Sequence, residues 1–144
     1  MPDSRAAVIT LHSSDGTEST VQHLSGEVVY TKTGLFIRYE EPDQIADGVA
    51  TRTTIIWSEG GEELKVLRHG GVQSQQLFRV GERLPGFYRS PFTTFNLSTH
   101  TRMLEIALNG GFGTLKWTYD FYVYEELSGQ FTISMQIQEE PRTC

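Results

Sequence analysis

Several features that define common protein classes are scarce in this sequence of 144 residues. It holds one cysteine, Cys144, so no internal disulfide can form and a reducing compartment is expected. Its longest uninterrupted apolar runs, such as 6–9 and 121–124, have four residues, whereas a membrane-spanning helix needs roughly 18. The first residues contain no basic stretch followed by an apolar segment, which a secretory signal would require. We therefore expect a cytoplasmic protein without membrane insertion.

The motifs of common chemistries are missing as well. There is no GxSxG nucleophile elbow, and the glycine-rich segment 110–113 lacks the Lys-Ser/Thr pair of a phosphate loop. The four histidines do not fall at the HxH or HExxH spacing that places two metal ligands on one face. We predict no metal, no cofactor and no catalytic residue. The enzyme question stays open, and a non-enzymatic protein is favoured.

Residues that favour β-strands are abundant. Val, Ile, Thr, Tyr, Phe and Trp make up about a third of the chain, whereas alanine contributes five residues. Apolar and polar residues alternate most clearly over 115–123 and 131–137, which predicts strands with one buried face. The length fits one domain. We predict an all-β protein whose single domain spans 1–144, with an ordered core of about 5–139.

Turn signals divide the chain into many short strands. Asn109-Gly110 predicts a tight hairpin turn, and 126–129 predicts another. Gly26 predicts a bulge, Pro85-Gly86 a turn, and Pro91 a bend within the following strand. About 8–10 strands in one small domain favour closure into an antiparallel up-and-down β-barrel, because closure removes exposed edges. Such a barrel either fills its interior with side chains or holds one small ligand.

Charge is distributed unevenly along the sequence. The formal net charge of −6 argues against a protein that coats nucleic acid. Segment 64–102 nevertheless contains six basic residues and one acidic residue, whereas the remainder contains six basic and 17 acidic residues. Two interpretations stay open. Either these arginines pair with the acidic flanks in the fold, or some of them hold an anion through their guanidinium groups.

Two arginines fall on otherwise apolar strand faces. Arg68 alternates with Leu64 and Val66, and Arg102 alternates with the apolar residues at 104, 106 and 108. If both faces line the interior, each guanidinium must pair with a protein carboxylate or with a bound anion. The candidate protein partners are Glu105, Asp120 and Tyr119.

In the functional interpretation, the two arginines hold the head group of a ligand and aromatic side chains line its apolar part. The candidate ligand-binding residues are Arg68, Arg102, Tyr119, Trp57, Phe78, Trp117 and Phe121.

Short motifs occur in a consistent order over nearly the whole chain, at 25–32, 35–41, 53–57, 68–70, 78–81, 88, 91–92, 98–101, 113 and 119. Together they resemble the YwiB-like family of small bacterial proteins. The resemblance implies a calycin-like β-barrel, related in architecture to lipocalins and fatty-acid-binding proteins. It implies no catalytic residue, because the family has no known function. Some calycin-like barrels ligate haem through one histidine, for which His69 or His100 would serve, although either is more often a surface or rim residue.

Three functions follow from the sequence as alternatives. The first is a non-enzymatic binder of one small amphipathic or anionic ligand in or at the mouth of the barrel. The second is a macromolecule-binding module that uses the basic face Leu64–Arg102 with Tyr122 and Tyr124, although the negative net charge disfavours nucleic acid. The third is an enzyme of unknown type. The sequence leaves open whether the barrel forms a homodimer.

Overall fold

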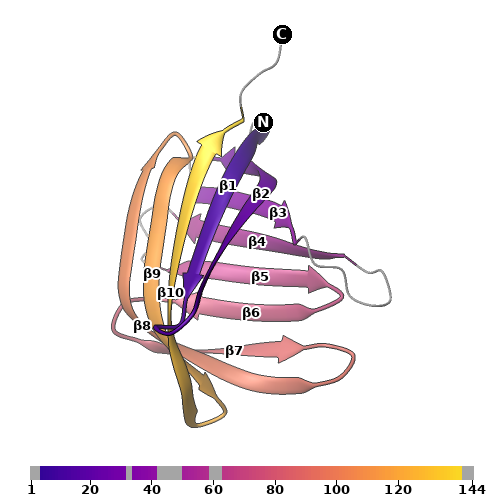
Figure 1. Cartoon of the computed structure of the whole chain (residues 1–144), viewed down its shortest axis with the longest axis vertical. Helices are drawn as coiled ribbons and strands as arrows, with labels where there is room; N and C mark the ends of the chain where they lie inside the picture. The colour runs from indigo at the N-terminus through magenta and orange to yellow at the C-terminus, as the bar shows by residue number, and fades with distance from the viewer. Residues whose placement is uncertain (1–3, 32–33, 42–49, 59–62, 141–144) are drawn as a thin grey trace.

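A closed β-barrel is the architecture of the computed structural model, which describes residues 4–31, 34–41, 50–58 and 63–140. Neighbouring strands in this part of the chain pair antiparallel in sequence order, and β1 also pairs with β10 (Figure 1). This arrangement confirms the predicted antiparallel barrel. The ten strands are β1 (Ser4–Ser14), β2 (Ser19–Tyr30), β3 (Gly34–Glu40), β4 (Thr51–Ser58), β5 (Leu64–Gly70), β6 (Gln73–Phe78), β7 (Arg83–Arg89), β8 (Thr94–Asn109), β9 (Phe112–Val123) and β10 (Glu126–Glu139).

The period-two pattern of the sequence becomes the inner face of the barrel. In β9, Leu115, Trp117 and Tyr119 are buried, while Thr114 and Lys116 between and beside them are exposed. Inward residues from different strands meet in one core, because a closed sheet brings all its inner faces together. The largest fully buried apolar side chains in this core are Ile9, Leu35, Ile37, Ile55, Leu64, Phe78, Leu115, Met135 and Ile137.

The barrel has a short seam between β6 and β7. Only three residue pairs join these strands, from Gln73 opposite Arg89 to Gln75 opposite Phe87. Beyond them the connection between β6 and β7 contacts β8 instead. The Gly81 N–H donates to the Thr101 carbonyl oxygen at 2.8 Å, and the Thr101 N–H donates to the Glu82 carbonyl oxygen at 3.4 Å.

Two glycine-based predictions are wrong. The pairing of β2 with β1 continues without a shift through Gly26, so no bulge occurs there. Gly26 instead makes room for the Arg38 carbonyl oxygen, with which a Cβ atom would collide. Pro85 and Gly86 lie inside β7 and do not form a turn. Gly86 passes so close to the Gln75 carbonyl oxygen that a Cβ atom has no space.

Two turn positions also differ from the prediction. Pro91 lies in the turn between β7 and β8, which the Ser90 N–H closes by donating to the Thr93 carbonyl oxygen at 2.8 Å. Segment 126–129 belongs to β10, and its turn-like composition reflects an irregularity between Leu127 and Gly129. The turn before it is 124–125. The predicted turn at Asn109-Gly110 is confirmed, with Gly110 at a φ of 64°.

We expect Gly86→Ala to lower the free energy of unfolding by about 2 kcal/mol, because the added methyl group would push β7 away from β6 at the seam. Urea denaturation measures the change. Gly129→Ala is the control, since a Cβ atom there meets only ordinary contacts with Phe131. Equal stability of Gly86→Ala and the unsubstituted protein would contradict the close approach of β6 and β7.

Candidate functional site

The interior of the barrel contains most of the predicted ligand-binding residues, namely Arg68, Tyr119, Trp57, Phe78, Trp117 and Phe121. Trp57 of β4 lies opposite Leu64 of β5, and Arg68 of β5 lies opposite Thr53 of β4. Four residues along β5 separate these two levels, which corresponds to about 13 Å in a strand. Trp57 and Arg68 therefore mark opposite ends of the interior.

An aromatic cluster fills the middle of the interior. The Phe78 ring centroid lies 4.7 Å from that of Tyr119 and 5.7 Å from that of Trp117. Phe131 extends the cluster, with centroids 5.7 Å from Tyr119 and 6.0 Å from Phe121. Burial raises the pKa of Tyr119 to about 12, so its phenol is neutral at physiological pH. The predicted aromatic residues in this cluster are thus in mutual contact.

Arg68 pairs inside the barrel with Glu41, which follows β3. Its Nε donates to Glu41 Oε1 at 2.7 Å and its Nη2 donates to Oε2 at 2.8 Å. The Thr53 hydroxyl donates to Glu41 Oε1 at 2.9 Å. Glu41 was not among the predicted partners, although it continues the inward alternation of Leu35, Ile37 and Tyr39. That alternation was the signal that could have identified it.

The electrostatics of this pair favour the charged forms. Burial alone would raise the pKa of Glu41, but the hydrogen bonds and charge of Arg68, together with the Thr53 hydroxyl, lower it overall. The hydrogen bond to Glu41 in turn raises the pKa of Arg68. Burial raises the pKa of nearby Tyr39 to about 12. The guanidinium of Arg68 is therefore already neutralised by a protein carboxylate.

Arg102 lies on the outer face of the barrel, which corrects the prediction that it shares the inner face with residues 104, 106 and 108. The pairing of β8 with β9 shifts between Thr101 and Met103, so Arg102 is an extra residue that offsets the alternation by one position. Its side chain is 56% exposed. A period-two pattern cannot reveal such an insertion.

Asp120, one of the predicted partners, holds Arg102 on that outer face. Arg102 donates to Asp120 Oδ2 from Nε at 2.9 Å and from Nη2 at 2.7 Å. The Gln130 amide donates to Asp120 Oδ1 at 3.2 Å, and His100 Nδ1 lies 3.8 Å from Oδ2. Hydrogen bonding by Arg102 is the main reason why the pKa of Asp120 is lowered. These contacts stabilise β8 against β9 and β10.

Most of the excess positive charge of segment 64–102 is neutralised in the same way. Besides Arg68 and Arg102, Arg79 pairs with Glu63 and Glu82 at 3.5 and 3.4 Å. Arg83 pairs with Glu125 at 3.4 Å. The interpretation that these arginines pair with carboxylates in the fold is confirmed for them. Arg89 differs, because its guanidinium lies 4.7 Å above the Phe87 ring and has no carboxylate partner in the described part of the chain.

Two buried polar atoms inside the barrel have no hydrogen-bond partner among the described residues, the Thr101 hydroxyl and the indole nitrogen of Trp117. Thr101 is fully buried, and Trp117 is 3% exposed. Both side chains come from the adjacent strands β8 and β9 beside the irregularity at Arg102. Leaving a buried donor unsatisfied costs about 1–3 kcal/mol. A hydrogen bond from a polar ligand atom would therefore contribute more free energy at these two atoms than elsewhere in the interior.

The mouth of the barrel near Trp57 contains a small pocket. It has a volume of about 170 Å³ and is lined by Tyr30, Gly34, Leu35, Trp57, Ile106 and Leu108. Trp57 and Leu108 both pack against the buried core. Sequence reasoning included Trp57 among the candidate ligand-binding residues but did not include Ile106 and Leu108 of β8. The pocket would accept a short apolar group.

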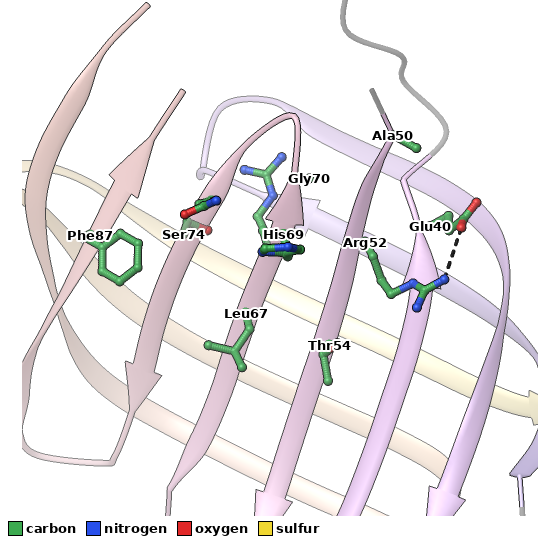
Figure 2. Close-up of a pocket in the computed structure, with 11 residues that line it drawn as sticks. Glu40, Ala50, Arg52, Thr54, Leu67, His69, Gly70, Ser74 and Phe87 are labelled. Carbon is green, nitrogen blue, oxygen red and sulfur yellow. Dashed lines mark hydrogen bonds and ion pairs between the residues drawn. The ribbon is translucent and has the colours of Figure 1, made fainter. Parts of the chain in front are cut away.

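A larger groove lies over β3 to β7, mostly on their outer face, with a volume of about 590 Å³ (Figure 2). Figure 2 shows Arg52 turned toward Glu40, with which it forms an ion pair at 3.4 Å, and His69 and Phe87 on two strands separated by the strand that carries Ser74. The lining residues are Glu40, Ala50, Arg52, Thr54, Leu67, Arg68, His69, Gly70, Gln73, Ser74 and Phe87. No signal within a single strand predicts this groove, because five strands contribute to it.

The described residues contain no group of three His, Cys, Asp or Glu side chains arranged to hold a metal ion. Of the two histidines considered for haem ligation, His69 lines the outer groove and His100 lies beside Asp120, so both face away from the interior. Cys144 lies outside the described residues. Within those residues there is also no helix long and apolar enough to cross a membrane.

The fold and interior define a ten-stranded β-barrel of a recognisable class. Residues 7–135 match the model of a family described as a domain of unknown function, DUF1934, and the chain belongs to this family. The chain is also similar to the "Uncharacterized beta-barrel protein YwiB" of Bacillus subtilis (strain 168). The two are 27% identical over 124 residues, which cover 82% of this chain and 84% of the relative.

The crystal structure of the ywiB protein from Bacillus subtilis has the same fold. The TM-score is 0.82 at 20% sequence identity, and the match covers 97% of this chain and 96% of that one. The predicted YwiB-like family and the closed barrel are therefore confirmed.

Replacing the carboxylate of Glu41 tests the internal ion pair. We expect Glu41→Gln to lower the free energy of unfolding by about 2 kcal/mol near pH 7, because Arg68 loses a charged hydrogen-bond partner. The folded-state pKa of Glu41 is lowered, so its contribution is complete above the unfolded-state pKa and is lost as pH falls through the folded-state value. The two proteins should therefore converge in stability in acid.

Urea denaturation at several pH values measures this difference. Glu40→Gln is the matched control, because its ion pair with Arg52 is exposed and contributes little. A difference between Glu41→Gln and the unsubstituted protein that does not shrink in acid would contradict the charged pair.

Two threonines of β8 provide a matched test of the unpartnered hydroxyl. Thr99 and Thr101 are both fully buried, but only the Thr99 hydroxyl is paired, donating to the Leu77 carbonyl oxygen at 2.6 Å. We expect Thr101→Val to raise the free energy of unfolding by up to about 1 kcal/mol and Thr99→Val to lower it by about 1 kcal/mol. Equal losses in urea denaturation would show that the Thr101 hydroxyl has a partner.

Proposed function

We propose that the protein binds one small, uncharged amphipathic molecule inside the barrel and does not transform it. The observation that carries this proposal is the pair of buried, unpartnered atoms, Trp117 Nε1 and Thr101 Oγ1, on the inner faces of adjacent strands. An indole N–H can only donate, whereas a hydroxyl can donate and accept. The molecule must therefore offer an acceptor, and a carbonyl oxygen has the required chemistry.

The apolar part of the molecule is expected at the Trp57 mouth. Phe78 contacts the Trp117 ring and lies in register with Leu64, which in turn lies opposite Trp57, so packed apolar side chains extend from the mouth to the unpartnered atoms. Sites for drug-sized ligands have volumes of about 300–1,000 Å³. The pocket of about 170 Å³ favours a short chain or a small ring.

The pairing of Arg68 favours an uncharged ligand over an anionic one. A ligand carboxylate at Arg68 would have to displace Glu41 and leave that carboxylate buried without its cation, which is costly. A ligand-binding site inside the barrel also agrees with the resemblance to calycin-like barrels.

The macromolecule-binding alternative receives less support. It uses the basic face Leu64–Arg102, but Arg79 and Arg83 of that face have carboxylate partners, and the Arg83 guanidinium also covers Tyr122 at 3.9 Å from the ring centroid. No observation favours a reaction, so no chemical step is proposed.

The two indole groups allow a direct test by nuclear magnetic resonance. The sequence has two tryptophans, so the spectrum of ¹⁵N-labelled protein contains two indole N–H peaks, which Trp57→Phe assigns. We expect the neutral ketone 2-octanone to shift the Trp117 peak saturably and octanoate to bind more weakly. Thr101→Val should weaken 2-octanone binding about fivefold, the effect of one net hydrogen bond.

Thr99→Val is the control and should keep the unsubstituted affinity, because its hydroxyl is directed to the Leu77 carbonyl. The proposal is overturned if neither indole peak moves up to the solubility limit of 2-octanone, or if the two threonine variants lose affinity equally.

A further inference from the structure

The hairpin of β6 and β7 contains an interval in which its two strands do not pair. The last residue pair of the seam joins Gln75 to Phe87, and the hairpin closes again only at its turn, where the Glu82 N–H donates to the Arg79 carbonyl oxygen at 3.1 Å. Residues 77–78 of β6 and 83–85 of β7, all in the described part of the chain, lie between these two points without facing partners. A stretch of sheet with so few backbone bonds opens at a lower free energy than the rest.

The hydroxyl of Thr99 links the strands across this interval. Thr99 belongs to β8 and lies opposite Leu84 of β7, so it sits on the β7 side of the seam. Its hydroxyl donates to the Leu77 carbonyl oxygen of β6 at 2.6 Å. This side-chain hydrogen bond therefore takes the place of a ladder bond and holds the seam closed.

The seam adjoins the two unpartnered atoms of the interior. Thr101 follows Thr99 by two residues and is likewise fully buried, and its carbonyl oxygen accepts from the Gly81 N–H in the β6–β7 connection at 2.8 Å. Phe78, the last residue of β6, has its ring centroid 5.7 Å from that of Trp117. Widening the seam would therefore admit a small molecule beside Thr101 Oγ1 and Trp117 Nε1.

Entry through the Trp57 mouth would instead disturb the core. Leu64 and Phe78 lie in register between Trp57 and the Trp117 ring, and they are 0% and 1% exposed. Moving either side chain exposes apolar surface, which costs more free energy than the loss of one hydrogen bond. The seam is therefore the easier route to the unpartnered atoms.

We propose that a small molecule reaches Trp117 through the seam between β6 and β7, and that the Thr99 hydroxyl controls the opening. The inference rests on the proposed binding inside the barrel, although the opening itself needs no ligand. Opening separates the Thr99 hydroxyl from the Leu77 carbonyl and leaves the pair of Gln75 and Phe87 in place. Thr99 acts on the rate of entry and does not contact the ligand.

Hydrogen exchange of the Trp117 indole N–H tests the opening in the protein without ligand. This N–H has no hydrogen-bond partner among the described residues, so its exchange rate reports the access of water. Nuclear magnetic resonance in D₂O follows the indole peak, which Trp57→Phe assigns. We expect Thr99→Val to accelerate the exchange about fivefold, the effect of one net hydrogen bond, because valine keeps the shape of threonine but cannot bond to Leu77.

Glu41→Gln is the control for unfolding of the whole barrel. It weakens the ion pair with Arg68 and is expected to destabilise the fold more than Thr99→Val does. If the seam controls access, Glu41→Gln should change the Trp117 exchange rate less than twofold. Faster exchange in Glu41→Gln than in Thr99→Val would show that water enters only by global unfolding, and it would overturn the proposal.

The kinetics of 2-octanone binding separate the route from the site. Thr99→Val should increase the association and dissociation rates by the same factor and leave the affinity unchanged, because the hydroxyl acts on the opening alone. An unchanged Trp117 exchange rate in Thr99→Val would overturn the route even if 2-octanone binds. Accelerated exchange without 2-octanone binding would overturn the proposed ligand and support the seam as the place where the barrel opens.

Discussion

Closure of the sheet through the pairing of β1 with β10 is the constraint on which the rest of the molecule depends. This pairing runs from Ala7 opposite Glu139 to Ser14 opposite Thr132. Once it forms, the inner faces of the strands share one interior from which water is largely excluded. Each polar group on an inner face must then find its partner inside the barrel, because an unsatisfied buried group lowers stability.

The interior meets this requirement at most positions and fails to meet it at one place. Glu41 accepts from both Arg68 and Thr53 at one end, and Thr99 donates to a backbone carbonyl beyond the short β6–β7 seam. The unpartnered Thr101 hydroxyl lies beside the bulged residue Arg102, where the β6–β7 connection also contacts β8. Irregular backbone and unsatisfied side chains therefore coincide, and such bulges often adjoin functional sites. The proposed ligand is the molecule that would satisfy these groups.

Charged groups on the outer face do not need a protein partner, because water screens them and each exposed ion pair contributes little to stability. The sequence contrast between a basic middle and acidic flanks becomes a set of pairs between neighbouring strands, such as Arg102 with Asp120. These pairs hold adjacent strands in register and leave little free positive charge. Arg89 is the described arginine outside this scheme, and it adjoins the largest apolar ring of the outer groove.

The sequence predicts the fold well because alternation with period two and turn residues are local signals. The number of strands then favours closure into a barrel. Alternation along each strand is enough to place Phe78, Trp117 and Tyr119 on its inner face. The predicted inner position of Arg102 was wrong because one inserted residue in β8 reverses which residues face inward. The residue types along the strand do not reveal this insertion. Glu41 was missed as a partner because its contact joins segments 27 residues apart. The outer groove could not be predicted, since it depends on the registers of five strands at once.

The central claim is that the interior holds a ligand at the Trp117 indole, and the most direct measurement is a high-resolution crystal structure of protein purified without added ligand. We predict electron density larger than one water molecule, with an atom within hydrogen-bond distance of Trp117 Nε1 and of the Thr101 hydroxyl. A protein acceptor or a single water at that position, in an interior otherwise filled by side chains, would contradict the account.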